Sequence, residues 1–487
     1  MRQGVGRILW GARLMMRPIV ETLGSRIPCW AHQGASNTWS LALPSLGWNV
    51  RSRRISLTQA VLVEETKNVK ASLGVFGGHL PKMPQGGYPV KPPDAVPDVL
   101  HSHGMPPGSQ ECQRFLNLCT GSCRIPAVEL ALAEGVPLAP LTTLELGGPA
   151  AYFSRAASIK QLQACCRWAE ERRLPLAVLG GGSNLVVADE GFPGLVVQLA
   201  WRELELFERG GKTVVVAGGA TAWQEVVDAA VAAGLGGLAC LAGIPGAAVT
   251  TPVQNVGAYG QEVAEHLLWV EAVHRRTGAL VRLFRHQCGL GYRKSVFRKP
   301  GNPFLLVRVA FGLQPADLVP VRYPELAQEL AHRRADPSPH QVVAAVLALR
   351  QKKGTILDPK DPEHRTVGSF FKNPLLSASA WERLRQRIWA QGILPPGETP
   401  PHFPAGSWVK VPAAWLVERA GFPKGLRRGP VGIASRHALA LVHLGGGTTA
   451  SLLALAREIQ SAVRATFGIT LEPEPAFLGF STPQPLE

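Results

Sequence analysis

The chain has 487 residues, 46% of them apolar, and a formal net charge of +16. This size allows several domains with substantial cores, and no run reaches the roughly 18 uncharged apolar residues of a membrane-spanning helix, so we expect a soluble protein. The basic residues form no dense run with interleaved aromatic side chains. This pattern indicates a solvated basic surface or a small anionic substrate, and it argues against a nucleic-acid partner.

Cysteine usage bounds the redox environment and the metal chemistry. Eight cysteines in a chain of this length do not make the framework of a disulfide-rich domain, and they fit a reducing cytoplasm. Cys112, Cys119 and Cys123 follow His101 and His103. None of these intervals is the two-residue spacing typical of zinc sites. We therefore expect a cytoplasmic protein without a bound metal.

The first 124 residues form an extension before the regular part of the chain. Residues 74–108 are rich in Gly and Pro, which predicts a disordered linker, and residues 1–73 follow neither a helical nor a strand period. The extension is interpreted as a small extra domain, a disordered arm, or residues translated only from an over-long gene start, with the true start near Met105. We favour the last two interpretations.

From about residue 125, well-signalled helices and strands follow one another. Capping boxes pair an N-cap hydroxyl with a Glu or Gln three residues later, and they predict helices that begin after Ser158, Thr221 and Ser338. Glycines placed to end helices in the left-handed conformation stand at Gly234 and Gly468. The irregular alternation of strands and helices predicts an α+β fold with mixed α/β layers rather than one doubly wound sheet.

A glycine loop follows the strand expected at 176–179 and precedes a second apolar run. Glycine lets backbone N–H groups approach a phosphate closely, while Ser and Asn add side-chain donors. An ordinary glycine turn has the same composition, but no helix follows, which excludes the Rossmann fingerprint. A pyrophosphate loop between strands resembles the flavin-binding fold of the vanillyl-alcohol oxidase type. The cofactor contacts expected in this loop are Gly180, Gly181, Gly182, Ser183 and Asn184.

A second glycine-rich segment spans residues 243–260. Its Gly, Pro, Asn and Thr residues build neither a helix nor a strand, so we expect a flat polar ligand against it. The segment resembles the flavin-contacting segment of the UDP-N-acetylenolpyruvoylglucosamine reductase family. The FAD contacts that this resemblance implies are Gly243, Pro245, Gly246, Thr250, Thr251, Gln254, Asn255, Gly257, Ala258 and Tyr259. The family usually has glycine where this chain has Val249, so the backbone there departs from the family pattern.

Three further motifs match the same family in the same order. They are Gly-Leu-Gly-Tyr-Arg-Lys-Ser at 289–295, Gly-Ser-Phe-Phe-Lys-Asn-Pro at 368–374 and Leu-Glu-Pro-Glu-Pro at 471–475. Taken singly, an Arg after Gly-Tyr, a Ser before Phe-Phe and a Glu between prolines are more often surface, turn and rim residues. Taken together, their resemblance to the family implies catalytic roles for Arg293, Ser369 and Glu474.

The resemblance also implies a reaction. This reaction is the FAD- and NADPH-dependent reduction of enolpyruvyl-UDP-N-acetylglucosamine to UDP-N-acetylmuramate, a step of peptidoglycan precursor synthesis. Hydride addition to the β-carbon leaves negative charge on the α-carbon and carboxylate, which the permanent charge of Arg293 would stabilise. Ser369 would deliver the proton to the α-carbon, and Glu474 would orient or polarise that end of the substrate.

Substrate contacts are implied by the same resemblance. They are Tyr323, Lys353, Lys372, Asn373 and His437. The tyrosine belongs to a loop that closes over the substrate in one subtype of the family, and we assign the chain to that subtype. For Lys353 an equally good interpretation is a lysine that complements the dipole at a helix end.

The resemblance implies a domain division as well. We expect an FAD-binding domain at 125–335 with subdomains at about 125–205 and 206–335, which the chain end at 469–487 rejoins. We expect an α+β substrate-binding domain at 336–468, with the active site where the domains meet. The protein is expected to be a monomer. The alternative is another FAD-dependent oxidoreductase of the same fold, which would not need the combination of Arg, Ser and Glu.

Overall fold

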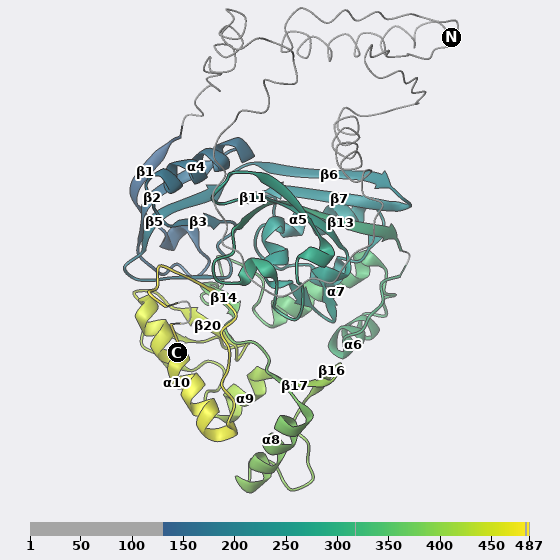
Figure 1. The fold of residues 1–487 in the computed structure, drawn as a ribbon. Coiled ribbons are helices and arrows are strands. Elements are labelled where there is room, and N and C mark those ends of the chain that lie inside the picture. The colour runs from purple at the N-terminus through teal and green to yellow at the C-terminus, as the bar shows by residue number, and fades with distance from the viewer. Residues whose placement is uncertain (1–129, 317, 483–484, 487) are drawn as a thin grey trace, which may run out of the picture. The chain divides into compact units, whose positions relative to one another are not determined.

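A computed structural model describes residues 130–316, 318–482 and 485–486 (Figure 1). The extension expected at 1–124, with its cysteine and histidine cluster, lies outside these residues. Within the described part, no helix is long and apolar enough to cross a bilayer. The same part contains no group of three or more His, Cys, Asp or Glu side chains that could hold a metal ion.

The first sheet has four strands in the order β1-β2-β5-β3. They are β1 (Leu132–Pro137), β2 (Pro149–Ala156), β5 (Phe192–Leu199) and β3 (Leu176–Leu179). The strand β3 has the bounds expected from the sequence. Strands β2, β5 and β3 are parallel, whereas β1 is antiparallel to β2. Helix α4 (Ile159–Glu171) packs against this sheet through Leu162 and Cys166, which are both buried.

The expected capping boxes are mostly wrong, although the helices begin where they were expected. Ser158 accepts a hydrogen bond from the backbone N of Gln161, but the Gln161 side chain accepts from Ala157 instead of closing the box. The buried Thr221 hydroxyl bonds the backbone of a neighbouring strand and does not cap the helix that follows. Ser338 makes no side-chain cap. Backbone geometry and packing therefore start two of these helices without help from a hydroxyl.

The second sheet is antiparallel, in the order β12-β11-β13-β7-β6, with β8 attached to β13. Its strands are β12 (Leu280–Phe284), β11 (Leu267–His274), β13 (Phe304–Pro315), β7 (Lys212–Gly219), β6 (Arg202–Arg209) and β8 (Leu235–Gly236). One face packs on helix α5 (Trp223–Ala232), where the fully buried rings of Trp223 and Phe311 meet edge to face at 5.5 Å. Gly234 follows α5 in the left-handed conformation, as expected.

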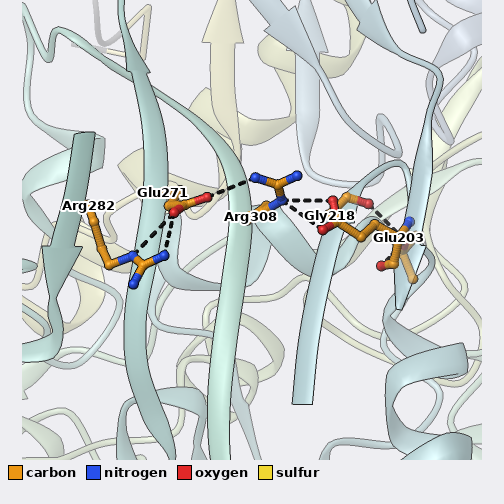
Figure 2. A network of polar contacts seen from close by, with 6 residues as sticks. Glu203, Gly218, Glu271, Arg282 and Arg308 are labelled. Atoms are coloured by element: carbon orange, nitrogen blue, oxygen red, sulfur yellow. Dashed lines mark hydrogen bonds and ion pairs between the residues drawn. The ribbon is translucent and has the colours of Figure 1, made fainter. Parts of the chain in front are cut away.

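The other face of this sheet carries a ladder of alternating charges (Figure 2). Arg308 donates to Glu203 at 2.8 Å and to Glu271 at 3.1 Å. Glu271 also accepts from Arg282 at 2.6 Å. A Cβ on Gly218 would lie 2.6 Å from a carboxylate oxygen of Glu203, so this glycine leaves room for the first rung. The ladder ties four strands together on the face away from α5.

Two further helices complete the first half of the fold. They are α6 (Pro324–His332) and α7 (Pro339–Lys352). The apolar side of α7, with Val342, Val346 and Leu349, lies in the same hydrophobic core as α4, α5 and the second sheet. A division at residue 335, as expected from the sequence, separates α7 from the core in which it packs. The packing instead places α7 with the first half of the fold.

The remaining part is built on another core. Its larger sheet has β14 (Thr366–Ser369), β20 (Ala440–His443), β19 (Val431–Ile433) and β18 (Arg427–Arg428). Its smaller sheet has β15 (Leu375–Leu376), β17 (Trp408–Lys410) and β16 (Phe403–Ala405), and its helices are α8 (Ala378–Ala390), α9 (Ala413–Arg419) and α10 (Thr449–Phe467). Phe370, Phe371 and Ile459 are buried in this core. Gly468 ends α10 with a φ of 71°, as expected, and an unforeseen capping box at Thr448 starts it.

Short elements carry the connections. The 3-10 helices are η2 (Ala139–Leu141), η3 (Ala239–Leu241), η4 (Ala248–Gln254), η5 (Val263–Glu265), η6 (Arg285–Gln287) and η7 (Val296–Arg298), and a small hairpin joins β9 (Gly257–Ala258) to β10 (Gln261–Glu262). The chain end returns as β21 (Ala476–Leu478), which pairs in parallel with β4 (Leu185–Val187) directly after the glycine loop. This return brings the last motif beside the first.

Candidate active site

The glycine loop forms the first wall of the candidate site. It connects β3 to β4 with no helix, as the sequence predicted. The backbone N–H groups of Gly181, Gly182 and Ser183 donate no hydrogen bond to any other described residue. Successive free N–H groups in a glycine turn are the donors that cradle phosphate oxygens. The loop therefore offers backbone donors of the kind that bind a pyrophosphate.

The second expected cofactor segment packs directly on this loop. A Cβ on Gly181 would lie 2.6 Å from Gly246 Cα, and one on Gly180 would lie 2.7 Å from a methyl carbon of Thr250. Ser183 Oγ donates to the carbonyl of Pro245 at 3.0 Å. The two segments thus form one continuous surface that only glycine backbones allow. At the start of the segment, the Gly243 carbonyl accepts a hydrogen bond from Arg350 Nε at 3.1 Å.

The departure at Val249 has a structural explanation. Val249 lies in η4, is 1% exposed, and packs in the main hydrophobic core. The hydroxyls of Thr250 and Thr251 donate to carbonyls one turn back, at 2.7 and 2.8 Å, so they brace this short helix. The valine side chain therefore contributes to the core of the fold.

Two amides of this segment are committed to protein contacts. Gln254 Oε1 accepts from Asn184 Nδ2 at 2.7 Å, which links the segment to the glycine loop. The fully buried Asn255 donates to Glu262 at 2.6 Å and to the Gly291 carbonyl at 3.1 Å. Its φ of 47° is in the left-handed region that asparagine tolerates. Both side chains hold the site together, so cofactor contacts from these positions would come from the backbone.

The catalytic candidates Arg293 and Glu474 meet in a largely buried ion pair. Arg293 Nε lies 2.8 Å from Glu474 Oε1, and the two side chains are 18% and 12% exposed. The angle at Nε is not that of a hydrogen bond, so this buried N–H has no partner among the described residues. Arg293 Nη2 donates to the Gly257 carbonyl at 3.0 Å, which fixes the guanidinium against the hairpin β9–β10.

The third catalytic candidate, Ser369, enters on a neighbouring strand. It ends β14, and the chain after it runs antiparallel to the Glu474 segment. Glu474 N donates to the Phe370 carbonyl at 2.8 Å, and Lys372 N donates to the Glu472 carbonyl at 2.9 Å. The buried Phe370 and Phe371 rings anchor this strand. The backbone after Ser369 thus pairs with the segment of Glu474, which in turn contacts Arg293.

An aromatic and cationic cluster lies beside the second cofactor segment. The rings of Tyr259 and Tyr323 meet edge to face at 5.5 Å, and Lys353 Nζ lies 5.6 Å from the Tyr259 ring centroid. Lys353 also donates to Glu325 at 2.5 Å and caps the end of α7. Burial raises the pKa of Tyr259 to about 12, so its hydroxyl stays protonated.

His437 belongs to the same cluster. Burial lowers its pKa to about 4, and the charges of Lys353 and Lys424 act in the same direction. The imidazole is therefore neutral at neutral pH. Its Nδ1 accepts from Leu439 N at 3.1 Å, which leaves the other ring nitrogen as the N–H donor. The side chain can hydrogen-bond a ligand but cannot neutralise one.

Lys372 and Asn373 both line one groove, and each also contacts a protein partner. Lys372 pairs with Glu472 at 3.1 Å and lines a groove of about 1020 Å³ between the turn at Tyr292, helix α8 and the end of α10. Asn373 Oδ1 accepts from Ala413 N at 2.8 Å and so supports the start of α9. Neither contact joins them to the cluster around Tyr259.

Sequence reasoning missed two cations of the site. Lys410, on β17, lies with its Nζ 5.2 Å from the Tyr292 ring centroid, and burial lowers its pKa. Arg298 contacts both Gln254 and the carbonyl of Pro475. Neither residue lies in a motif with a recognisable chemical pattern. Only the folding of β17 and η7 onto the site reveals them.

The fold and the glycine surface define the class of protein. An FAD binding domain model matches residues 150–283. Free backbone donors at the loop and the close glycine contacts agree with such a domain. The chain is therefore an FAD-binding oxidoreductase, which confirms the expected flavin fold and α+β class.

The particular family follows from the second half of the chain. A model described as UDP-N-acetylenolpyruvoylglucosamine reductase, C-terminal domain, matches residues 360–478. A reductase of this name from Thermobifida fusca (strain YX) is 47% identical over 353 residues, which cover 72% of this chain and 98% of the relative. One from Streptomyces coelicolor is 44% identical and covers 70% and 89%. The chain belongs to the UDP-N-acetylenolpyruvoylglucosamine reductase family, as its motifs indicated.

A solved structure is also similar. The crystal structure of UDP-N-acetylenolpyruvylglucosamine reductase from Thermus caldophilus is 27% identical in sequence. The match covers 72% of this chain and all of that chain, with a TM-score of 0.49.

Proposed function

We propose that this protein reduces enolpyruvyl-UDP-N-acetylglucosamine to UDP-N-acetylmuramate with FAD and NADPH, in the cytoplasm, as a step of peptidoglycan precursor synthesis. The observation that carries the proposal is the buried pair of Arg293 and Glu474 beside the strand of Ser369. The backbone just after Ser369 bonds the segment of Glu474, and Arg293, which pairs with Glu474, donates to Gly257 in the second cofactor segment. Membership in the family supplies the substrate.

The cofactor fits the residues that are present. The free N–H groups of the glycine loop would hold the FAD pyrophosphate, and the 243–259 segment would line its ring system. Bound FAD supplies hydride chemistry, with NADPH as the source of the electrons. The protein's own part is to bind, orient and exclude water around the reacting carbon atoms.

Arg293 stabilises the charge that develops in the substrate. When hydride reaches the β-carbon, negative charge spreads from the α-carbon into the carboxylate. The guanidinium is permanently charged, is held by the Gly257 carbonyl, and among the described residues its buried Nε–H makes an ion pair but no hydrogen bond. A preorganised cation in a largely buried site stabilises such charge strongly.

Ser369 delivers the proton that completes the reduction. The α-carbon gains this proton as the β-carbon gains hydride, so one C=C bond is replaced by two new C–H bonds. A serine hydroxyl is a weak acid, and it donates effectively only toward accumulating negative charge. Glu474 orients the substrate end and the guanidinium, because its carboxylate already touches Arg293.

The uridine diphosphate part of the substrate is assigned to the cluster of Tyr323, Lys353 and His437. Lys353 offers a cation near Tyr259, and the neutral imidazole offers a hydrogen bond. We assign the chain to the subtype in which the tyrosine loop closes over the substrate, because Tyr323 already stacks edge to face on Tyr259. Lys372 and Asn373 keep further donors besides their protein contacts, and we assign them to the substrate as well. We propose a monomer, since all three catalytic segments belong to one chain.

Isotope labelling tests this function and its roles. Reduction should convert the former β-carbon into a product methyl group. Turnover in D2O should place deuterium at the α-carbon, and Ser369→Ala should slow that incorporation. NADPH oxidation that consumes oxygen and leaves the enolpyruvyl ether unchanged would instead identify a flavin oxidase.

A further inference from the structure

The backbone around Glu474 has few ways to be held in place. Pro473 and Pro475 flank it, and proline has no backbone N–H to donate. Glu474 N donates to the Phe370 carbonyl at 2.8 Å on one side, and Ala476 N donates to the Asn184 carbonyl at 3.0 Å on the other. Between these two bonds, only carbonyl oxygens remain to fix the direction in which the Glu474 side chain leaves the backbone.

Arg298 binds one of these carbonyl oxygens, that of Pro475. Its Nη2 donates to the carbonyl of Pro475 at 3.2 Å, and its Nη1 donates to Gln254 Oε1 at 3.0 Å. The same Gln254 oxygen accepts from Asn184 Nδ2 at 2.7 Å. A closed circuit of hydrogen bonds thus joins Arg298, the second cofactor segment, the glycine loop and the C-terminal segment.

The local fold holds Arg298 rigidly in this circuit. It ends η7, which begins at the N-cap Ser295 and carries the buried Phe297. Ser295 Oγ accepts from Phe297 N and donates to the Val253 carbonyl at 2.5 Å, so η7 is tied to the segment that also carries Gln254. Arg293 lies in the turn just before η7. The stretch 293–298 therefore contacts the Glu474 region at two points: Arg293 pairs with the Glu474 carboxylate, and Arg298 binds the Pro475 carbonyl.

Burial of the Arg298 guanidinium disfavours its positive charge. Burial lowers the pKa of Arg298, whereas the nearby Glu474 and Glu472 carboxylates favour its charged form. A desolvated cation is retained where an uncharged donor could have bonded the same carbonyl. The planar guanidinium reaches two acceptors in different segments at once, which the single ammonium of lysine does not reproduce.

We propose that Arg298 is a positioning residue that fixes Glu474 against Arg293 for reduction of the enolpyruvyl substrate. This inference rests on the proposed function and adds a fourth residue to its machinery. The reason for a kinetic effect is geometric, since displacement of a catalytic group by about 1 Å can cost about 100-fold in rate. Arg298 acts through Glu474 and does not itself touch the reacting atoms.

The test compares Arg298→Lys with the control Arg275→Lys in the flavin-loaded protein. Arg275 is also a desolvated arginine that donates to a carbonyl, that of Leu176 at 2.9 Å, outside the site. For Arg298→Lys we expect reoxidation by the enolpyruvyl substrate to slow about 30- to 100-fold. Reduction by NADPH, and the substrate Kd measured from the oxidised flavin spectrum, should change less than about 3-fold. Arg275→Lys should leave all three unchanged.

A double variant separates positioning from general damage. If Arg298 works through Glu474, Arg298→Lys should slow the Glu474→Gln protein by less than about 3-fold more. Equal losses in both half-reactions, multiplicative losses in the double variant, or a substrate Kd weakened as much as the rate would each overturn the proposal.

If the lysine variant loses flavin or unfolds, the Arg298→Ala variant is tested instead. Its reoxidation should recover with added guanidinium but not with sodium at equal ionic strength, and no recovery overturns the proposal. Failure of the wild-type protein to be reoxidised would refute the proposed function instead.

Discussion

Replacement of Gly181 by alanine should separate the two surfaces that hold the cofactor. The new Cβ would lie 2.6 Å from Gly246 Cα, 3.2 Å from Gly246 C and 3.3 Å from Ala247 N. The nearest contact falls about 0.8 Å short of the ordinary 3.4 Å. All three neighbours are backbone atoms, so the strain cannot be relieved by turning a side chain. Overpacking of this kind costs about 1 to 3 kcal/mol.

That energy should appear mainly as lost FAD affinity, because the loop moves away from the segment it must face. At about 1.4 kcal/mol per tenfold, we expect Kd for FAD to rise about 5- to 140-fold. The assay is titration of the apoprotein with FAD, followed by flavin fluorescence, together with Tm without FAD. Gly312→Ala is the control, since its Cβ would crowd only the flexible Leu268 side chain at 2.9 Å. Wild-type affinity in Gly181→Ala, or equal loss in the control, would refute the reasoning.

Three further predictions concern single side chains. Ser369→Ala should leave flavin reduction by NADPH within about 3-fold while slowing turnover of the enolpyruvyl substrate about 100-fold or more, and equal losses in stopped-flow measurements would remove its role as proton donor. Burial lowers the pKa of His437 from 6.5 to about 4. Between these two pH values His437 is protonated in the unfolded chain but not in the folded protein, so the folded state loses stability as the pH falls. His437→Gln should therefore restore up to about 3 kcal/mol of stability at pH 4 and none above pH 7, and an unchanged Tm profile against pH would contradict the assignment. Glu271→Gln should cost about 1 to 3 kcal/mol in denaturant unfolding without altering FAD affinity, since it leaves Arg282 without a carboxylate partner and Arg308 with Glu203 alone, whereas Glu205→Gln on the exposed edge strand should change stability by less than about 0.5 kcal/mol.

The sequence predicted the family of the protein better than the details of its site. Five short motifs in family order identified the family, because chemistry restricts residue types tightly at reacting atoms, whereas the catalytic roles of Arg293, Ser369 and Glu474 stay predictions. The roles of Asn255 and Asn373 were not visible. An amide side chain has the same donors and acceptors whether it faces a ligand or braces a loop, and only coordinates separate the two.

Local helix signals failed for a similar reason. A hydroxyl followed three residues later by Glu or Gln predicts a capping box, yet Thr221 lies buried beside a strand whose backbone groups take up its hydroxyl. Helix starts survived, because apolar faces and backbone geometry also specify them. The boundary near residue 335 was misplaced relative to the packing because α7 resembles any amphipathic helix in sequence, and its core is chosen by tertiary contacts.

Positioning residues are the hardest to predict. Arg298 and Lys410 stand in ordinary surroundings in the sequence, and each becomes informative only when folding places it beside a carbonyl or a ring. Val249 shows the opposite case. In the sequence it stands out as a departure from the family's glycine, and the structure shows its side chain buried in the core.

The most direct measurement of the proposed function is an anaerobic two-step spectral experiment on the flavin-loaded protein. NADPH added alone should bleach the oxidised flavin band, and enolpyruvyl-UDP-N-acetylglucosamine added next should restore it, with UDP-N-acetylmuramate formed in equal amount to the flavin reoxidised. A band that NADPH does not bleach, or one that returns only when oxygen is admitted, would contradict the account.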